Sequence, residues 1–262
     1  MAKGDTKERI KRIQSHLGLV ADGIIGPNTL TALENVLFNE SQREASGEHF
    51  SLIVSKKGLQ QIVKQEISSA AYYRKFLSHP IWPGGASGIA IGIGYDLGYN
   101  TGQQIRNDWS GKLCEIDLEK LVAVSGFKSD AARTALKNVQ TILIPLETAQ
   151  SVFYETMLSR YAAATAKIYP GVQALHPNAQ AALLSLVYNR GTSLNGPRRK
   201  EMAAIKDLVA QQDYGGISQE IRAMKRLWEK KGLDGLLKRR EREAKLVSQI
   251  NISLDESEIV RV

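Results

Sequence analysis

Residues 88–99 read GIAIGIGYDLGY, a glycine-rich segment in which isoleucines alternate with small residues at positions 89, 91 and 93. A period of two is typical of a strand rather than a helix. The glycines allow tight bends and let a ligand approach the backbone closely. We therefore predict a hairpin here, with Asp96 just past a short strand.

An amphipathic helix precedes the hairpin and carries one acidic residue on its apolar face. The apolar positions that follow Gly58 at steps of three and four are Leu59, Ile62, Val63, Ile67, Ala70 and Leu77. Glu66 shares their face, because it lies four residues after Ile62 and three after Val63. We expect the helix to end near His79-Pro80, since the residue before a proline avoids helical geometry.

Glu66 and Asp96 are predicted to flank one groove in unlike environments. Partial burial of Glu66 favours its protonated form, which a general acid requires. A pair of carboxyl groups of this kind is the minimum apparatus for hydrolysing a glycosidic bond. The alternative is that Glu66 reaches water at the edge of the stripe, or pairs with a nearby Lys or Arg.

Other chemistries find little support in the sequence. The spacing of Gly92, Gly94 and Gly98 misses the dinucleotide fingerprint by one residue, and no Gly-Lys-Ser/Thr follows it. The four histidines have no metal-ligand spacing, and Gly-x-Ser-x-Gly is absent. We expect neither a metal nor a cofactor.

At this point the chain resembles a known family. A helix with one Glu, followed by SGIAIGIGYDLGY at residues 87–99, is similar to the muramidase domains of the pesticin type, which belong with the phage-type lysozymes. Residues 180–191, 198–202 and 239–244 resemble, in order, the long core helix with its turn, the segment after it and the closing helix. The resemblance implies a mainly α, lysozyme-like α+β fold with one short β-hairpin.

The resemblance also implies roles for individual residues. Glu66 becomes the general acid and Asp96 its partner carboxylate, with inversion of the anomeric centre favoured. Asn189 and Arg190 are expected to line the substrate groove. The alternative is that Asn189 caps its helix and Arg190 makes a structural ion pair.

The hairpin departs from the family pattern at one position. The resemblance implies a hydroxyl residue, usually Thr, six positions before the partner Asp, and this chain has Ala90 there. Ser87 lies nearby, but a regular strand would put residues 87 and 90 on opposite faces. We count Ser87, Ala90 and Tyr95 among the substrate-binding positions. Because Ala90 has no hydroxyl, we expect either reduced activity or another way of holding the attacking water.

The amino-terminal residues form a separate unit. Ile10, Ile13 and Leu17 indicate one short helix, and Leu30, Leu33, Val36 and Leu37 indicate a second. Between them, Gln14-x-x-Leu17 and the run DGIIGPNT at residues 22–29 resemble the small helical peptidoglycan-binding domains. The resemblance implies wall binding through Asp22, Gly23, Gly26 and Thr29. The alternative is a helical hairpin without a ligand.

These patterns divide the chain into a binding module at 1–38, a polar linker at 39–50, a lysozyme-like domain at 51–250 and an acidic tail at 251–262, which we expect to be disordered. The helices predicted after the hairpin are 101–110, 115–124, 128–138, 146–168, 177–189, 198–211, 214–230 and 232–248.

Composition narrows the functional classes. The net charge of +8, from 35 basic and 27 acidic residues, steers the protein toward anionic envelope surfaces. Basic residues are interspersed with Glu in Lys238–Glu243, which is typical of a solvated helix face, and no nucleic-acid recognition motif is present. The single cysteine, Cys114, excludes an intramolecular disulfide and is expected to be a small buried residue.

The chain starts MAKGDTKER, which lacks the apolar core of a signal peptide, and no stretch approaches a membrane span. We therefore expect a monomer made in the cytoplasm without stable membrane insertion, acting on the cell wall in the periplasm. A holin, a secretion-system carrier or an immunity protein would each fit as its partner.

The sequence thus predicts a peptidoglycan hydrolase that cleaves the β-1,4 bond between N-acetylmuramic acid and N-acetylglucosamine and causes bacterial lysis. A degenerate wall-binding protein and a lytic transglycosylase are the alternatives within the fold. A basic nucleic-acid-binding protein is the alternative from another class, and it predicts a steeply salt-dependent affinity for DNA.

Overall fold

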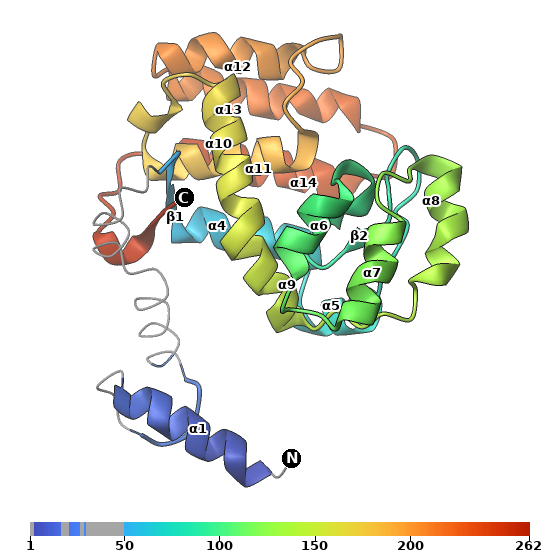
Figure 1. Ribbon diagram of the computed structural model, residues 1–262. Helices are drawn as coiled ribbons and strands as arrows, with labels where there is room; N and C mark the ends of the chain where they lie inside the picture. The colour runs from blue at the N-terminus through green and yellow to red at the C-terminus, as the bar shows by residue number, and fades with distance from the viewer. Residues whose placement is uncertain (1–2, 17–20, 27–28, 30–49) are drawn as a thin grey trace. The chain divides into compact units, whose positions relative to one another are not determined.

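The computed structural model describes residues 3–16, 21–26, 29 and 50–262, and it separates the chain into two compact units, Met1–His49 and Phe50–Val262 (Figure 1). In the first unit, helix α1 spans Lys3–His16. The predicted second helix and the linker residues 39–49 lie outside the described part of the chain, as does Leu17.

Gln14 organises the loop of the first unit. Its side chain is buried, and its Nε2 lies 2.6 Å from Asp22 Oδ1 and 3.0 Å from Thr29 Oγ1. Its Oε1 accepts a hydrogen bond from the Gly23 N–H at 2.8 Å. Gly23 has φ +74°, a conformation that favours glycine. Three of the four predicted wall-binding residues, Asp22, Gly23 and Thr29, therefore hold the loop around Gln14. Among the described residues, no atom lies within 4 Å of the Cβ position of Gly26.

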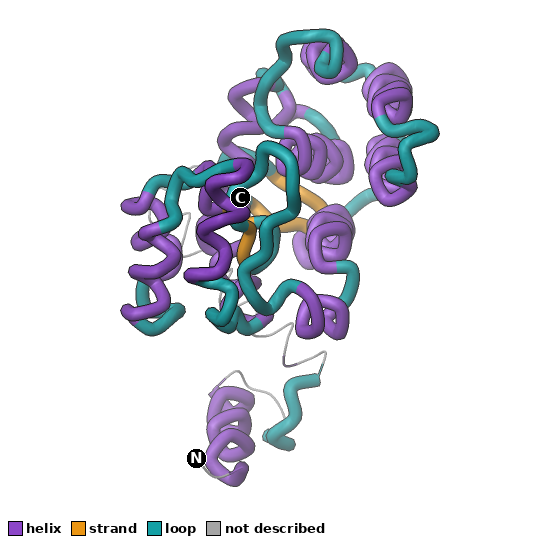
Figure 2. The backbone as a smooth tube through the Cα atoms, turned by 90° about the vertical axis from the view of Figure 1, so that its right-hand side faces the viewer, coloured by secondary structure: helices purple, strands orange, loops and turns teal. Residues whose placement is uncertain are grey.

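The second unit is mainly α, as predicted, with two short antiparallel strand pairs (Figures 1 and 2). Its α-helices are α4 (Lys56–Ile67), α5 (Ala70–Phe76), α6 (Gly102–Trp109), α7 (Glu115–Ala123), α8 (Ser129–Ala135), α9 (Leu146–Val152), α10 (Leu158–Ile168), α11 (Pro177–Arg190), α12 (Lys200–Ala210), α13 (Tyr214–Ala223) and α14 (Asp234–Val247). Short 3-10 turns at Leu97–Tyr99, Leu136–Asn138, Val172–Ala174, Met224–Leu227 and Glu256–Glu258 join or extend them. A π-helical turn, Phe153–Met157, joins α9 to α10 in the predicted helix 146–168.

Helix α11 forms the centre of this unit. Every residue from Asn178 to Tyr188 is buried, so the helix is enclosed on all sides. The predicted apolar stripe of Ala179, Ala182, Leu183, Leu186 and Val187 is fully buried, with each residue 0% exposed. Burying one such leucine contributes about 1.5–3 kcal/mol. Packing around α11 therefore fixes the helices that carry the candidate site.

The carboxyl-terminal residues are part of the fold. Strand β4 (Ile259–Arg261) pairs antiparallel with β1 (Ile53–Ser55), and Val54 lies opposite Val260. The prediction of a disordered acidic tail at 251–262 is therefore wrong. The Asp255 side chain accepts from the Ser257 N–H and caps the turn that leads into β4. The acidic residues in this segment close a turn, which is a common use of Asp.

The helix predicted from Gly58 to Leu77 is two helices. Ser68 adopts φ +58° and ends α4, and the Ser69 side chain accepts from the Tyr72 N–H at 3.1 Å to start α5. Serine side chains that bond to the backbone favour caps over helix interiors. The expected run of apolar positions thus stops at Ile67, and Ala70 is exposed.

Cys114 is exposed and occupies the N-cap position of α7, so the prediction of a buried cysteine is wrong. The start of a helix lies at the surface, and the apolar neighbours Leu113 and Ile116 did not reveal that position.

No described helix is long and apolar enough to cross a membrane. Within the same residues, no group of three or more His, Cys, Asp or Glu side chains is arranged to hold a metal ion.

Candidate active site

Helix α4 is anchored firmly before it reaches Glu66. The Ser55 side chain accepts from the Gly58 N–H at 3.2 Å and caps the helix. A Cβ at Gly58 would lie 2.3 Å from Ala181 Cβ, so only glycine lets α4 cross α11 this closely. The crossing fixes the direction in which the last turn of α4 projects Glu66.

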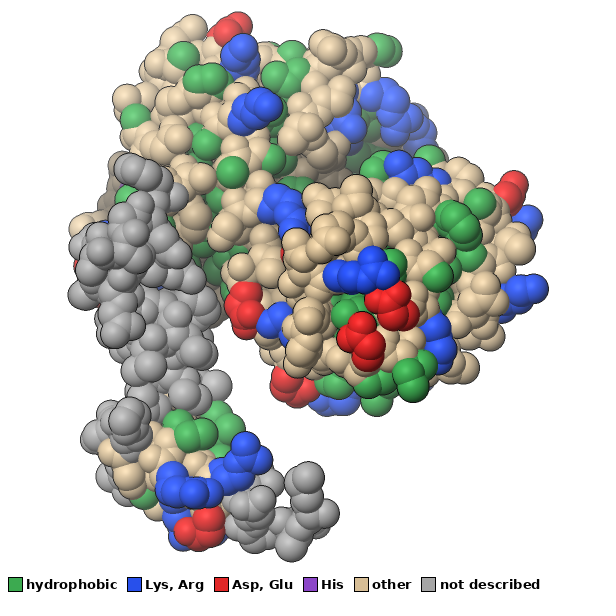
Figure 3. Space-filling model, viewed as in Figure 1, with side chains coloured by type: hydrophobic (Ala, Val, Ile, Leu, Met, Phe, Trp, Pro, Cys, Tyr) green, Lys and Arg blue, Asp and Glu red, His purple; other side chains and the backbone are tan. Residues whose placement is uncertain are grey.

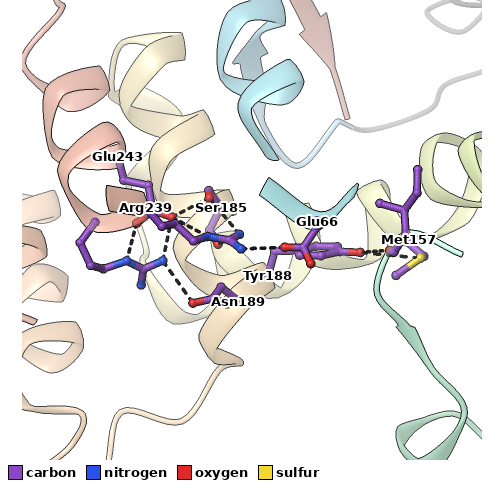
Figure 4. Close-up of polar contacts among 9 residues, drawn as sticks. Glu66, Met157, Ser185, Tyr188, Asn189, Arg239 and Glu243 are labelled. Carbon is purple, nitrogen blue, oxygen red and sulfur yellow. Dashed lines mark hydrogen bonds and ion pairs between the residues drawn. The ribbon is translucent and has the colours of Figure 1, made fainter. Parts of the chain in front are cut away.

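Glu66 is partly buried and paired with an arginine. Its side chain is 20% exposed, and its Oε1 lies 2.7 Å from Nη1 of Arg239 on α14 (Figure 4). Burial works to lower the pKa of Arg239, but the charges of Glu66 and Glu243 outweigh it and raise that pKa. The predicted partial burial is therefore correct, and the left-open alternative of pairing with an arginine also holds.

Arg239 belongs to a buried polar network that connects α11 and α14. Arg239 and Arg240 both contact the carboxylate of Glu243, which also accepts from Ser185 Oγ at 2.6 Å. Arg240 Nη2 donates to Asn189 Oδ1 at 3.2 Å (Figure 4). The prediction of a solvated face at Lys238–Glu243 is wrong for these residues, since Arg239, Arg240 and Glu243 are at most 5% exposed. The sequence signal for this burial is the spacing of the residues. Arg240 lies four residues before the buried Ala244, and Glu243 lies four before the buried Val247.

The predicted hairpin is present, with strands shorter than expected. Strand β2 is Ala90–Ile91, β3 is Tyr95–Asp96, and Gly92 and Gly94 adopt φ +59° and +69° in the turn between them. Asp96 thus lies in the second strand rather than past a single one. Its register partner is Ala90.

The hairpin is held against α11 beside Glu66. Tyr188 Oη donates to the Ile93 carbonyl oxygen at 2.5 Å. A Cβ at Gly94 would lie 3.0 Å from Tyr188 Oη and 3.4 Å from Glu66 Oε2. The carboxylate of Glu66 therefore faces the hairpin two residues from Asp96.

Asp96 is held by backbone donors on both sides. Its Oδ1 accepts from the Gly98 N–H at 2.8 Å and its Oδ2 from the Gly88 N–H at 3.1 Å. A Cβ at Gly88 would lie 2.2 Å from Asp96 Oδ1, so this approach requires glycine. Burial raises the pKa of Asp96, although both N–H groups and the charge of Lys128 act to lower it.

The charges of Glu66 and Asp96 both act on one tyrosine, Tyr161. Burial is the largest cause of the raised pKa of Tyr161 on α10, and the charges of Glu66 and Asp96 raise it further. Tyr161 also packs on Tyr188, with ring centroids 4.5 Å apart. The structure therefore brings the two predicted carboxylates to one place, with Tyr161 near both.

The other hairpin residues divide between the surface and the core. Ala90 is half-buried and its N–H and carbonyl groups both bond to Ile81, so its Cβ alone is available beside Asp96. Ser87 lies in a turn before β2, where its carbonyl accepts from Trp82 Nε1 at 3.2 Å. The argument from opposite strand faces therefore does not apply to Ser87.

Tyr95 is a core residue. It is 1% exposed, its hydroxyl donates to Asp108 Oδ2 at 2.7 Å, and its ring meets Trp109 edge-on. Arg160 on α10 completes this contact with an ion pair to Asp108 at 2.9 Å. Tyr95 therefore supports the hairpin from the core, whereas the sequence predicts that it contacts substrate.

Asn189 and Arg190 end α11 on the same side as the Glu66 network. Asn189 is exposed and accepts from Arg240, and Arg190 is half-buried and donates to the Arg198 carbonyl oxygen at 2.6 Å. Arg190 makes no ion pair among those that the structure records within the described residues, contrary to the structural alternative. The sequence did not identify Arg239, Tyr161 or Tyr188 as neighbours of Glu66. Arg239 forms an ion pair with Glu66, and the charge of Glu66 acts on both tyrosines.

Two family models match parts of the chain. The phage lysozyme family model matches residues 126–243, and the putative peptidoglycan binding domain model matches residues 3–33. The part of the chain from residue 126 to 243 is similar to the phage lysozymes. A search of curated proteins finds no match.

The two matched spans fit a lysozyme-type function in peptidoglycan degradation, with peptidoglycan as the polymer that the protein contacts. The lysozyme match contains Asn189, Arg190 and Arg239 but begins after Glu66 and Asp96. Figure 3 shows basic and acidic side chains intermixed on one face of the lysozyme unit rather than gathered in one basic field.

Proposed function

We propose that this protein is a muramidase that hydrolyses the β-1,4 bond between N-acetylmuramic acid and N-acetylglucosamine, and so lyses bacteria. The observation that carries the proposal is the position of the Glu66 carboxylate, 3.4 Å from the Cβ position of Gly94 in the hairpin that bears Asp96. Two carboxyl groups in a shared site are the apparatus that glycoside hydrolysis needs.

Glu66 protonates the leaving glycosidic oxygen, and Arg239 orients its carboxyl group through the contact at 2.7 Å. Asp96 activates the water on the opposite face of the sugar, held in place by the Gly88 and Gly98 N–H groups. This arrangement inverts the anomeric centre. No cofactor takes part in either step.

Digestion of purified peptidoglycan tests this assignment. The wild type and Glu66→Gln are incubated with sacculi, and the released fragments are identified by mass spectrometry. Reducing muropeptides from the wild type alone are expected, because the amide cannot donate the proton. Glu119→Gln is the matched control, since Glu119 on α7 is exposed and pairs with Arg106 rather than with Arg239.

A second candidate function follows from Ala90. Its Cβ lies in register with Asp96 and offers no hydroxyl to the attacking water. A wall-binding protein without turnover would then release no fragments, and Glu66→Gln would bind sacculi as well as the wild type. Anhydro products, which lack the added water, would instead assign a lytic transglycosylase.

The amino-terminal unit supports the proposal that peptidoglycan is the polymer bound. We propose that it binds the wall, that the protein acts as a monomer and that its site of action is the periplasmic peptidoglycan. The ordered loop around Gln14 gives this unit a defined surface despite its short length.

A further inference from the structure

Arginines gather where α11 ends and α12 begins. Arg190 donates from Nη2 to the Arg198 carbonyl oxygen at 2.6 Å, and Arg199 is the N-cap residue of α12. The guanidinium carbons of Arg190 and Arg240 lie 5.0 and 5.8 Å from the ring centroid of Trp228. The charges of Arg199, Arg240 and Arg198 all act on Arg190, so the four cations lie near one another.

The positive charge at this spot is poorly balanced. Burial, followed by the charges of Arg199 and Arg240, lowers the pKa of Arg190 to about 10. Glu201 is the carboxylate that counters it, but Glu201 is itself bound by Arg226. Arg240 is paired with Glu243, which it shares with Arg239. Removing cations from water without a counter-ion is costly, so the spot favours an anion.

Several donors at this spot have no partner among the described residues. Within that part of the chain, Arg190 Nε, Arg240 Nη1 and Tyr169 Oη are buried polar atoms without a hydrogen bond. Both Arg240 and Tyr169 are 0% exposed. The charges of Arg190, Arg199 and Arg240 all act on Tyr169, which places its hydroxyl near them, although burial outweighs them and raises its pKa. Buried donors almost always have a partner, so unpaired donors on neighbouring residues indicate a missing acceptor.

The start of α12 adds to the same effect. The helix has 11 residues, and no side chain caps its first N–H groups. The amino-terminal end of a helix attracts anions through these free donors and the helix dipole.

We propose that Arg190, Arg198 and Arg199 form an oxyanion-binding site, with Arg240 and Tyr169 behind it. Guanidinium groups match the oxygens of carboxylate and phosphate groups in geometry and charge. A carboxylate on the peptide of peptidoglycan and a free phosphate share this chemistry.

The site continues the polar network of the candidate active site. Asn189 precedes Arg190 and is bonded to Arg240, whose neighbour Arg239 holds Glu66. A peptide attached to the bound glycan would therefore reach the arginines from the groove. This source of the anion rests on the proposed function, whereas phosphate binding does not.

The first experiment measures anion binding by the full-length wild type. Inorganic phosphate and acetate are each titrated by calorimetry at constant ionic strength, with chloride as the reference. Saturable binding of either oxyanion above chloride is expected. Its absence for both would overturn the proposal without any variant.

The second experiment uses Arg198→Met, because Arg198 is exposed and its loss is tolerated most readily by the fold. We expect the oxyanion to bind roughly tenfold more weakly or worse. Arg133→Met removes an exposed arginine, paired with Asp130, from another helix and should leave the affinity unchanged. Equal loss in both variants would mean a nonspecific charge effect and would overturn the site.

The third experiment identifies the source of the anion. Glu66→Gln and Glu66→Gln/Arg198→Met are bound to glycan strands that carry their peptides and to strands from which the peptides have been removed. Weaker binding of the double variant to peptide-bearing strands alone assigns a substrate carboxylate. Equal binding of both proteins to both polymers, with phosphate binding intact in the wild type, assigns free phosphate. If the protein does not hydrolyse peptidoglycan, phosphate binding by the wild type would still be measurable. Failure of the proposed function can therefore be distinguished from failure of the proposed anion site.

Discussion

The guanidinium of Arg239 lies 2.7 Å from the carboxylate of Glu66, although 173 residues separate the two in the chain. The arginine comes from α14 and the acid from the last turn of α4, and both helices pack on α11. This ion pair, rather than an apolar pocket alone, fixes the orientation of the candidate general acid toward the hairpin.

Arg239→Met should destabilise the protein and orphan Glu66. Removing one partner of a buried pair costs about 3–5 kcal/mol. Because Glu66 keeps 20% of its side chain exposed, we expect the lower end of that range. Urea unfolding at neutral pH measures the change.

The control for this pair is Arg242→Met, which removes an exposed arginine from the same helix. It should change the free energy of unfolding by less than about 0.5 kcal/mol. Equal effects of the two substitutions would show that Arg239 contributes only general charge.

The acid limb of the pH profile should report Asp96. Because burial raises its pKa, Asp96 becomes ionised only above the usual aspartate range. Activity that needs the carboxylate should therefore fall, as pH decreases, at a higher pH than for an ordinary Asp. Measurement of kcat/KM against pH at constant ionic strength checks this.

Lys128 provides the matched perturbation. Its charge lowers the pKa of Asp96, so Lys128→Met should raise that pKa and move the acid limb further up. A limb that stays in place would show that another group controls it. Lys137→Met, an exposed lysine near the end of the same helix segment, is the control.

Ala90→Thr should increase turnover. The residue lies in register with Asp96 and is half-buried, so an added hydroxyl would sit beside the carboxylate that activates water. Ala90→Val adds the same bulk without the hydroxyl. Faster release of muropeptides by the Thr variant and not by the Val variant supports the water-orienting role, whereas equal rates would exclude it.

Gly58→Ala should be destabilising. Its Cβ would lie 2.3 Å from Ala181 Cβ, which forces α4 away from α11 at a cost of about 1–3 kcal/mol. Gly235→Ala, in α14, meets nothing within 4 Å and should be neutral or stabilising by up to about 1 kcal/mol. Thermal unfolding of both variants separates the packing effect from the effect of glycine itself, and a stable Gly58→Ala would contradict the close crossing.

Gln14→Leu should weaken wall binding without altering the lysozyme unit. The amide contacts Asp22, Gly23 and Thr29, and an apolar side chain leaves these groups unpaired. Co-sedimentation with sacculi is the measurement, in the Glu66→Gln background. Gln103→Leu, in the lysozyme unit, is the control, and unchanged sedimentation of the Gln14 variant would mean that the loop does not bind wall.

Local sequence patterns determined much of the lysozyme unit. The stripe of α11, the hairpin at residues 88–99 and most helix spans follow from periodicity, glycine and caps, which act over a few residues. Glu66 could be predicted as partly buried because Ile62 and Val63 set its face.

Tertiary structure decided what these segments contact. Arg239 pairs with Glu66, although the sequence predicts a solvated face for its helix. Tyr95 donates to Asp108 in the core, although the sequence places it among the substrate-binding positions. The tail at 251–262 read as disordered from its charge, yet β4 found an unpaired strand edge at β1. Such pairings join positions that are far apart in the chain, and periodicity carries no information about them. Local periodicity thus determines which face of each helix is apolar, and the packing around α11 determines what that face contacts.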